Sequence, residues 1–424
     1  MPSPNNSFSQ EERVDFESML LGFDDNLVYT DLIRKYMIDQ QMLARSNDTI
    51  WRPQPYIAAT YDGTDATANF RKFTQLSVPV SVSYHKHAAA VFTPLELRDA
   101  LQENRVSDSA KQKLASDINA AIMRMAATQS TLAIKRTTAA KGFDDVALIE
   151  AMMNESGIGY GDRNLALSTR DYNSMASDLA SRQTMDKKPA TAFERAYVGT
   201  IASFDTYKMD YAFRLPVAGG SGVTIDTRDA GANYYIPKST SVATTGESSN
   251  VDNRYHLVTV SSTTGVNAGD IFTLTGVNAV HHITKNDTGE LKTYRVIKVN
   301  SSTTMTVSPP IISNQVASDA SGQYQNCVVN TKSSTSAIVW LNTALTAANI
   351  FWHKDAFEMI PGRYIIPSNA GIAVNKGTTE QGIEIVVQKA ADIDTNHIKY
   401  RWDIHFGLAC IQPEMCGIIL FNQT

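Results

Sequence analysis

The chain has 424 residues, of which 43% are hydrophobic and 19% are charged, and its formal net charge is -5. This length allows two or three domains with a sizeable core, and the composition is that of a globular protein. No apolar run reaches the length of a membrane span and the first residues lack a secretory pattern, so we expect no membrane association. The sequence contains an odd, sparse set of three cysteines. It predicts a reducing compartment, without a disulfide framework or a zinc site.

The negative charge is concentrated in the first forty residues. Residues 1–40 hold eight acidic side chains against three basic ones, and the rest of the chain holds 35 of each sign. A sequence-specific DNA-binding domain would show a basic patch, and none is found. The acidic segment favours two interpretations equally: a basic protein partner, or solubility alone.

The first two segments differ in pattern. Residues 1–45 are predicted to form a helical arm, because Val28, Leu32, Tyr36 and Leu43 recur at helical spacing. Residues 46–88 form an extended excursion, in which apolar residues alternate with polar ones along the second half. A lone pair of strands is marginally stable in water, so we expect this excursion to pack on another surface, such as another subunit.

A long helix and a mixed region follow. An apolar stripe predicts a helix from about Ser107 to Ile134, which is ~40 Å long at about 1.5 Å per residue. Residues 143–217 are predicted to be mixed α/β, with helices over Asp144–Met153 and Asp171–Arg182 on either side of the short strand Leu165–Ser168.

A β-domain follows the mixed region. Residues 221–350 contain 36 Ser or Thr and only 16 charged residues. Strand-like runs cover Tyr255–Val260, Ile271–Leu274, Tyr294–Val299 and Met305–Val307, and turn clusters lie at Asn267–Asp270 and Asn286–Gly289. This spacing predicts a β-barrel or sandwich. Residues 350–424 return to an α/β pattern, so the β-domain is an insertion whose flanks we expect to meet in space.

No motif in the sequence predicts a catalytic, nucleotide-binding or metal site. A nucleophile elbow and a phosphate-binding loop are both absent, and Gly157–Gly161 lacks nucleotide-binding spacing and is better explained as a helix end. His85 and His87 share one face of a predicted strand but have no third ligand. The tryptophans are interpreted as core or interface anchors. For Trp51 we favour a core position over a subunit interface.

Four stretches carry a resemblance to a known family. They are Ser46–Pro53; Asn250–Tyr255 with its continuation through Thr263–Gly265 and Gly269–Asp270; Asn349–Trp352; and Arg401–Asp403 through Gln412–Met415. With the order of elements, they resemble the coat proteins of P-twenty-two-like tailed phages with double-stranded DNA. The resemblance implies an α+β fold, the Hong Kong 97-like phage capsid fold with an inserted antiparallel β-barrel domain.

The resemblance also implies a division of the chain into six parts. They are an N-terminal arm (1–45), an extended loop (46–88), a peripheral domain with the spine helix (89–142), the first part of an axial domain (143–221), the inserted six-stranded β-barrel (222–348), and a return to the axial and peripheral domains (349–424).

The implied function is that of a major capsid protein, and not of an enzyme. Its copies would assemble as hexamers and pentamers into an icosahedral head shell, with a scaffolding protein and a portal, in the host bacterial cytoplasm. The shell would enclose double-stranded DNA without sequence-specific contact or cofactor. The implied intersubunit residues are Trp51, Arg71, Lys72, Glu247, Asp252, His281, Lys285 and Asp287. The implied scaffold-facing residues of the arm are Glu11, Glu12, Asp15 and Glu17.

Three alternatives stay open at this stage. The first is another phage structural part, such as a tail or decoration protein, which would form rings or fibres. The second is an encapsulin-like compartment shell, although such shells generally lack this insertion. The third is a hydrolase with a β-accessory domain, which would need a convergent nucleophile, base and orienting group.

Overall fold

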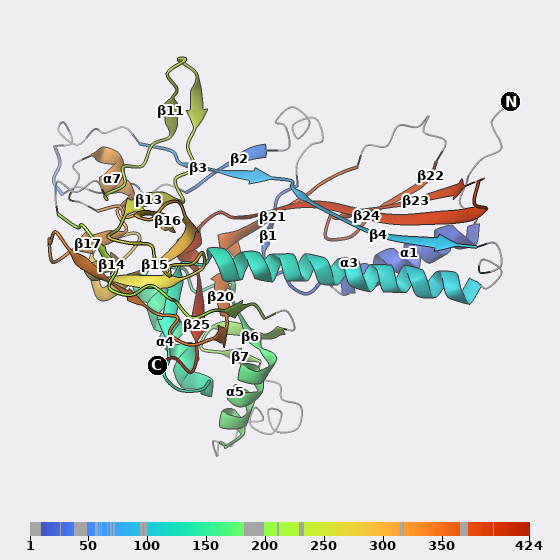
Figure 1. The fold of residues 1–424 in the computed structure, drawn as a ribbon, viewed down its shortest axis with the longest axis horizontal. Helices are drawn as coiled ribbons and strands as arrows, with labels where there is room; N and C mark the ends of the chain where they lie inside the picture. The colour runs from blue at the N-terminus through green and yellow to red at the C-terminus, as the bar shows by residue number, and fades with distance from the viewer. Residues whose placement is uncertain are drawn as a thin grey trace. The chain divides into compact units, whose positions relative to one another are not determined.

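A computed structural model of the chain describes residues 10–25, 27–37, 49–55, 58, 60, 62–65, 67, 70, 73–93, 96, 100–181, 199–209, 212–228, 233–313, 315, 318–364, 372–392 and 394–424. The chain forms two compact units. The first comprises Met1–Ile50, Val80–Ile122 and Phe357–Ala409, and the second comprises Trp51–Pro79, Met123–Ala356 and Cys410–Thr424. Figure 1 traces the elements. No helix in the described part of the chain is long and apolar enough to cross a membrane.

The first unit is built on a six-stranded sheet. Its order is β1-β21-β24-β23-β22, and β4 also pairs with β24. The strands are β1 (Arg34–Lys35), β4 (Tyr84–Phe92), β21 (Phe357–Pro361), β22 (Ala373–Thr378), β23 (Glu384–Asp392) and β24 (His397–Cys410). Alternate residues of β24 form a buried apolar face: Tyr400, Trp402, Ile404 and Phe406. The intervening residues Asp403 and His405 are buried as well, so both faces of β24 are covered over this stretch.

The helical arm is shorter than the sequence predicts. Helix α1 (Gln10–Asp25) buries Phe16, Met19 and Phe23 at helical spacing. The predicted helical pattern from Val28 onward is wrong over the described residues, because this stretch forms turns and then β1. Strand β1 pairs in parallel with β21, more than 300 residues away. Leu43 lies outside the described residues.

The long helix is present but shifted toward the N-terminus. Helix α3 spans Ala100–Gln129 and begins in the first unit. Its predicted end at Ile134 is wrong, because β5 (Leu132–Lys135) pairs in parallel with β25 (Cys416–Leu420). The apolar stripe therefore continues from a helix into a buried strand. The side chain of Thr131 at this junction donates a hydrogen bond of 2.7 Å to the carbonyl oxygen of Pro413.

The second unit contains a mixed sheet with two helices against it. The sheet order is β5-β25-β20-β6-β8-β7. Its other strands are β20 (Asn349–His353), β6 (Arg163–Ser168), β8 (Phe204–Met209) and β7 (Thr200–Ile201). Helices α4 (Gly142–Glu155) and α5 (Thr169–Ser181) bury Ile149, Met153 and Met175 in the same core. The predicted helices and strand of this region are confirmed. The 3₁₀ helices η2 (Lys354–Ala356) and η3 (Pro413–Met415) lie beside this core.

The β-domain of the second unit is a nearly closed barrel. Six strands follow in the order β10-β18-β14-β15-β16-β13, and an isolated bridge between Ile225 and Val260 joins the two ends. The strands are β10 (Thr224–Ile225), β13 (His256–Thr259), β14 (Ile271–Val280), β15 (Asp287–Val299), β16 (Thr304–Ser308) and β18 (Ser336–Trp340). A seventh strand, β17 (Cys327–Val329), pairs with β14 in addition to the six that we expected.

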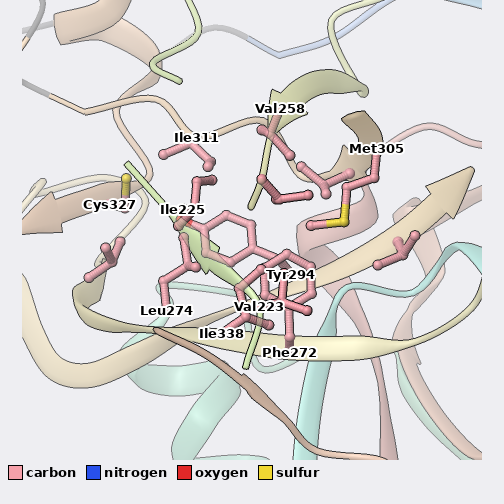
Figure 2. Close-up of a cluster of buried hydrophobic side chains, with 14 of the residues drawn as sticks. Val223, Ile225, Val258, Phe272, Leu274, Tyr294, Met305, Ile311, Cys327 and Ile338 are labelled. Carbon is pink, nitrogen blue, oxygen red and sulfur yellow. The ribbon is translucent and has the colours of Figure 1, made fainter. Parts of the chain in front are cut away.

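The interior of the barrel is filled by apolar side chains from all of its strands. Figure 2 shows Phe272, Tyr294 and Met305 pointing into this cluster together with smaller aliphatic residues. Phe272 and Tyr294 are directly opposite on β14 and β15, and their ring centroids lie 5.6 Å apart. The alternation of inward and outward residues explains why the barrel could be predicted from strand patterns.

The two connections to the barrel run side by side, as an inserted domain requires. Strand β9 (Arg214–Leu215) enters the barrel and pairs with β19 (Thr346–Ala347), which leaves it. One predicted turn is wrong: Asp287–Gly289 begins β15, and the chain reverses over 281–286 instead.

Candidate functional site

A hairpin projects from the barrel, and its tip is closed by backbone hydrogen bonds from the N–H of Ala243 to the carbonyl oxygen of Glu247 and from the N–H of Gly246 to that of Ala243, both 2.9 Å. Strands β11 (Thr240–Val242) and β12 (Ser248–Asn250) pair in antiparallel register, and every residue from 238 to 250 is exposed. Figure 1 shows the hairpin extending away from the other barrel strands. Val242 is 67% exposed, which is unusual for an apolar strand residue. Exposed strands of this kind are available for contact with another chain.

The base of the hairpin is held rigidly by two buried side chains. Asn253 accepts the backbone N–H of Lys238 at 3.0 Å and donates to its carbonyl oxygen at 2.8 Å. Arg254 forms an ion pair of 2.7 Å with Asp252 and donates to the carbonyl oxygen of Cys410 at 2.8 Å. Asp252, an expected intersubunit residue, therefore has a partner within its own chain, whereas Glu247 stays on the exposed tip.

The second group of expected intersubunit residues lies around the reversal between β14 and β15. The ring of His281 packs against Gly157, and the ammonium of Lys285 donates to the carbonyl oxygen of Gln325 at 3.0 Å. Burial lowers the pKa of Lys285 to about 8. Asp287 accepts the N–H of Gly289 at 2.8 Å. The structure thus gives all three side chains contacts within the subunit.

The extended segment supplies exposed aromatic side chains. Strands β2 (Thr49–Pro53) and β3 (Ser77–Ser81) form a two-stranded sheet. Trp51 is 36% exposed, so our preference for a core position is wrong. Phe73 is 59% exposed beside Thr74, whose carbonyl oxygen accepts the hydroxyl of Tyr324 at 2.7 Å from helix α7 (Asp319–Tyr324). Arg71 and Lys72 lie outside the described residues.

The acidic residues of the arm lie on α1. Glu17 is exposed and Asp15 is half-buried, while the side chains of Glu11 and Glu12 lie outside the described set. The opposite side of the helix holds the buried residues Phe16 and Met19. Glu17 therefore presents a negative charge on a part of the helix that is not packed.

Sequence reasoning missed a polar anchor between the barrel and the mixed sheet. Three polar residues of β15 contact residues outside the barrel. Lys292 pairs with the carboxylate of Glu414, Thr293 donates to the carbonyl oxygen of Thr131 at 2.8 Å, and Arg295 donates to that of Ser130 at 3.0 Å. Burial raises the pKa of Glu414 more than any single interaction lowers it, but Lys292, His282 and Lys285 together outweigh burial and hold the pKa below its usual value.

The ion pair of this anchor gives a stability prediction. The Lys292 side chain is 7% exposed and that of Glu414 is 30% exposed. Glu414→Gln leaves the ammonium without its counter-charge, so we expect it to cost about 2 kcal/mol of unfolding free energy, the range of a hydrogen bond between charged groups. Urea unfolding of the full-length subunit measures this loss. The control is Glu290→Gln, at an exposed position of β15, the strand that carries Lys292. Equal stability of the two variants would show that the pair contributes nothing to the anchor.

A catalytic or metal centre is not apparent in the described part of the chain. Among those residues no group of three or more His, Cys, Asp or Glu side chains is placed to hold a metal ion. His85, one of the two histidines that share a strand face, stacks on His405 with ring centroids 3.7 Å apart. Gly157 follows α4 with a φ of 81°, as expected for a glycine at a helix end.

The chain is similar to a known protein family and to solved structures of phage proteins. The sequence model of a family described as P22 coat protein, gene protein 5, matches residues 5–422. A solved structure from Mycobacterium phage Che8 is 8% identical, with 93% of this chain and 90% of that chain covered and a TM-score of 0.44. The capsid structure of cyanophage P-SCSP1u is 11% identical, with 94% and 89% covered and a TM-score of 0.46.

One further similar structure covers a part of the chain. The CUS-3 coat protein I-domain is 37% identical, with 29% of this chain and 99% of that chain covered and a TM-score of 0.22.

The long helix, the extended segment and the inserted barrel are the elements expected of a phage coat protein. The match over nearly the whole length is specific, and the chain belongs to the P22 coat protein family. It is a major capsid protein that forms the icosahedral shell of a phage. A structural family of this kind is typically non-enzymatic.

Proposed function

We propose that copies of this chain assemble as hexamers and pentamers, with the β11–β12 hairpin as a contact between neighbouring subunits. The observation that carries this proposal is that residues 238–250 are all exposed, above a base fixed by Asn253 and Arg254. A fixed base and a hydrogen-bonded tip suit docking to another chain, because little conformational entropy is lost on binding. Many weak contacts of this kind sum to a stable closed shell.

We assign a proposed role to each of the six parts of the chain. The arm (1–45) faces a scaffolding protein through Glu11, Glu12, Asp15 and Glu17. The extended loop (46–88) reaches a neighbouring subunit through Trp51, Arg71 and Lys72. The peripheral (89–142) and axial (143–221 and 349–424) domains form the shell wall, and the barrel (222–348) carries the hairpin with Glu247. The exposure of Trp51 and Glu17 supports these assignments.

Three of the residues that we first expected to lie between subunits need a narrower role. Asp252, Lys285 and Asp287 already have partners in their own chain. We therefore propose that they shape the hairpin base and the β14–β15 reversal, with His281, while the neighbouring exposed side chain of Ile283 is available for contact.

The proposed setting is the cytoplasm of a bacterial host. There the chain would assemble with a scaffolding protein and a portal, and the shell would then receive double-stranded DNA without sequence-specific contact. A chain with 43 acidic and 38 basic residues supports weak attraction to DNA. No enzymatic activity, cofactor or membrane is part of this proposal.

Electron microscopy of the full-length chain, expressed with and without its neighbouring phage genes, tests the assembly proposal. We expect closed shells, with uniform size when a scaffolding protein is present. Monomers alone under both conditions would contradict the proposal.

The hairpin contact gives a separate prediction. Val242→Asp places a charge on the exposed tip, so we expect the yield of closed shells to fall while the unfolding free energy changes by less than about 0.5 kcal/mol. The matched control is Val339→Asp on β18, where the valine is 47% exposed. Shell yield by sedimentation and subunit stability by urea unfolding give the two values. Equal yields for both variants would remove the hairpin from the assembly interface.

A further inference from the structure

Two buried cysteines face each other where the last two strands of the chain meet. Cys410 ends β24 and Cys416 begins β25, and both are 0% exposed. Their sulfur atoms lie 3.9 Å apart. A disulfide has a sulfur–sulfur distance of about 2.05 Å, so a relative movement of roughly 2 Å would join them.

The turn between the two cysteines has space in which to move. A cavity of about 100 Å³ lies in the second unit, and four consecutive turn residues line it: Gln412, Pro413, Glu414 and Met415. Well-packed interiors resist shifts of this size, whereas a void beside a short turn allows them. The approach of the two sulfur atoms therefore does not require repacking on the cavity side of the turn.

Two buried guanidinium groups lie beside the pair. Arg254 donates to the carbonyl oxygen of Cys410 at 2.8 Å. Arg295 is 0% exposed and interacts electrostatically with Cys416. Its Nε and Nη2 atoms have no hydrogen-bond partner among the described residues.

We propose that Cys410 and Cys416 form an oxidisable pair that a low-molecular-weight disulfide, such as oxidised glutathione, converts to an intrachain disulfide. Cys416 loses its proton to solvent and attacks the reagent, which releases one glutathione thiolate and leaves a mixed disulfide. Cys410 then loses its proton and attacks the Cys416 sulfur, which releases the second glutathione thiolate. The pair loses two electrons and two protons, and the reagent is reduced to two thiols.

The disulfide would fix the turn that carries Glu414, and with it the anchor between Lys292 and the mixed sheet. Burial, followed by the neighbouring Cys416, raises the pKa of the Cys410 thiol well above its usual value. Oxidation of the folded protein is therefore expected to be slow and to follow local opening of the turn. Once formed, the bond restricts the unfolded chain and stabilises the folded one.

The test treats the full-length reduced protein with oxidised glutathione under native conditions and measures the intact mass. We expect a species lighter by two hydrogen atoms, and a Cys410–Cys416 peptide in a non-reducing digest. The oxidised protein should unfold at a higher urea concentration than the reduced protein. A folded protein that keeps both thiols, while the same chain oxidises readily in urea, would overturn the proposal.

Serine variants separate the pair from the third cysteine. Cys327→Ser is the matched control and should still lose two hydrogen atoms, since Cys327 is buried inside the barrel. Cys410→Ser should instead gain one glutathione at Cys416. Should these variants fail to fold, alanine variants and the peptide digest of the wild-type chain give the same distinction. A crosslink that includes Cys327 would also overturn the assignment.

Discussion

Replacing Phe272 by alanine is expected to unfold the inserted barrel selectively. The ring is 0% exposed, and it packs on Tyr294 and on Trp340 with centroid distances of 5.6 Å for each pair. Truncating a buried phenylalanine costs about 3–5 kcal/mol, because transfer free energy is lost and a cavity remains. The two aromatic contacts add to this loss. We expect the barrel of Phe272→Ala to exchange its amide hydrogens far faster than that of the wild type.

Hydrogen exchange read by mass spectrometry checks this prediction strand by strand. Peptides from β14, β15 and β16 should lose protection, whereas peptides from β23 and β24 in the other unit should keep it. Leu257→Ala is the control, since this residue of β13 is 56% exposed and its truncation should change stability by less than about 0.5 kcal/mol. Equal protection of the amide hydrogens in Phe272→Ala and Leu257→Ala would mean that neighbouring side chains fill the cavity left by the ring.

The sequence predicts those elements whose pattern is local. The strands of the barrel and the helices α4 and α5 were found because their apolar residues repeat with the period of one element. The end of α3 was missed because Leu132 and Ala133 continue its stripe, although they belong to β5 and pair with β25 about 285 residues later. The pairing of β1 with β21 overrides the helical spacing after Val28 in the same way.

The candidate site was predictable only in part, for a similar reason. The exposed hairpin falls in the Ser/Thr-rich segment, where few apolar side chains could be buried, and resemblance placed a contact there. The anchor of Lys292, Thr293 and Arg295 was missed, because its partners lie 122 to 165 residues away in the sequence. The sequence pattern of a strand also does not indicate which residue a charged side chain will contact. The preference for Trp51 as a core residue failed because tryptophan is typical of both cores and interfaces.

Acidification is expected to weaken the barrel through His256. This side chain is 6% exposed, and its Nδ1 atom accepts the N–H of Ile311 at 3.4 Å, which a neutral ring allows. Burial lowers the pKa of His256 from 6.5 to about 4. Between these values the unfolded chain binds a proton that the folded barrel excludes, so the unfolding free energy falls as the pH falls. The total loss is about 3 kcal/mol, and it is complete below pH ~4, where both states are protonated.

The pH dependence of the difference between wild type and His256→Gln isolates this histidine from the carboxylates. Glutamine cannot take up a proton in this range, and its amide oxygen is an acceptor for the N–H of Ile311. The wild type should therefore lose about 3 kcal/mol more than the variant between pH 6.5 and 4, as measured by urea unfolding of the full-length subunit. His87→Gln, at an exposed position of β4, should follow the wild-type curve. Parallel curves for wild type and His256→Gln would mean that the imidazole takes up a proton as readily in the folded chain as in the unfolded chain. The barrel would then open locally at His256 before it unfolds.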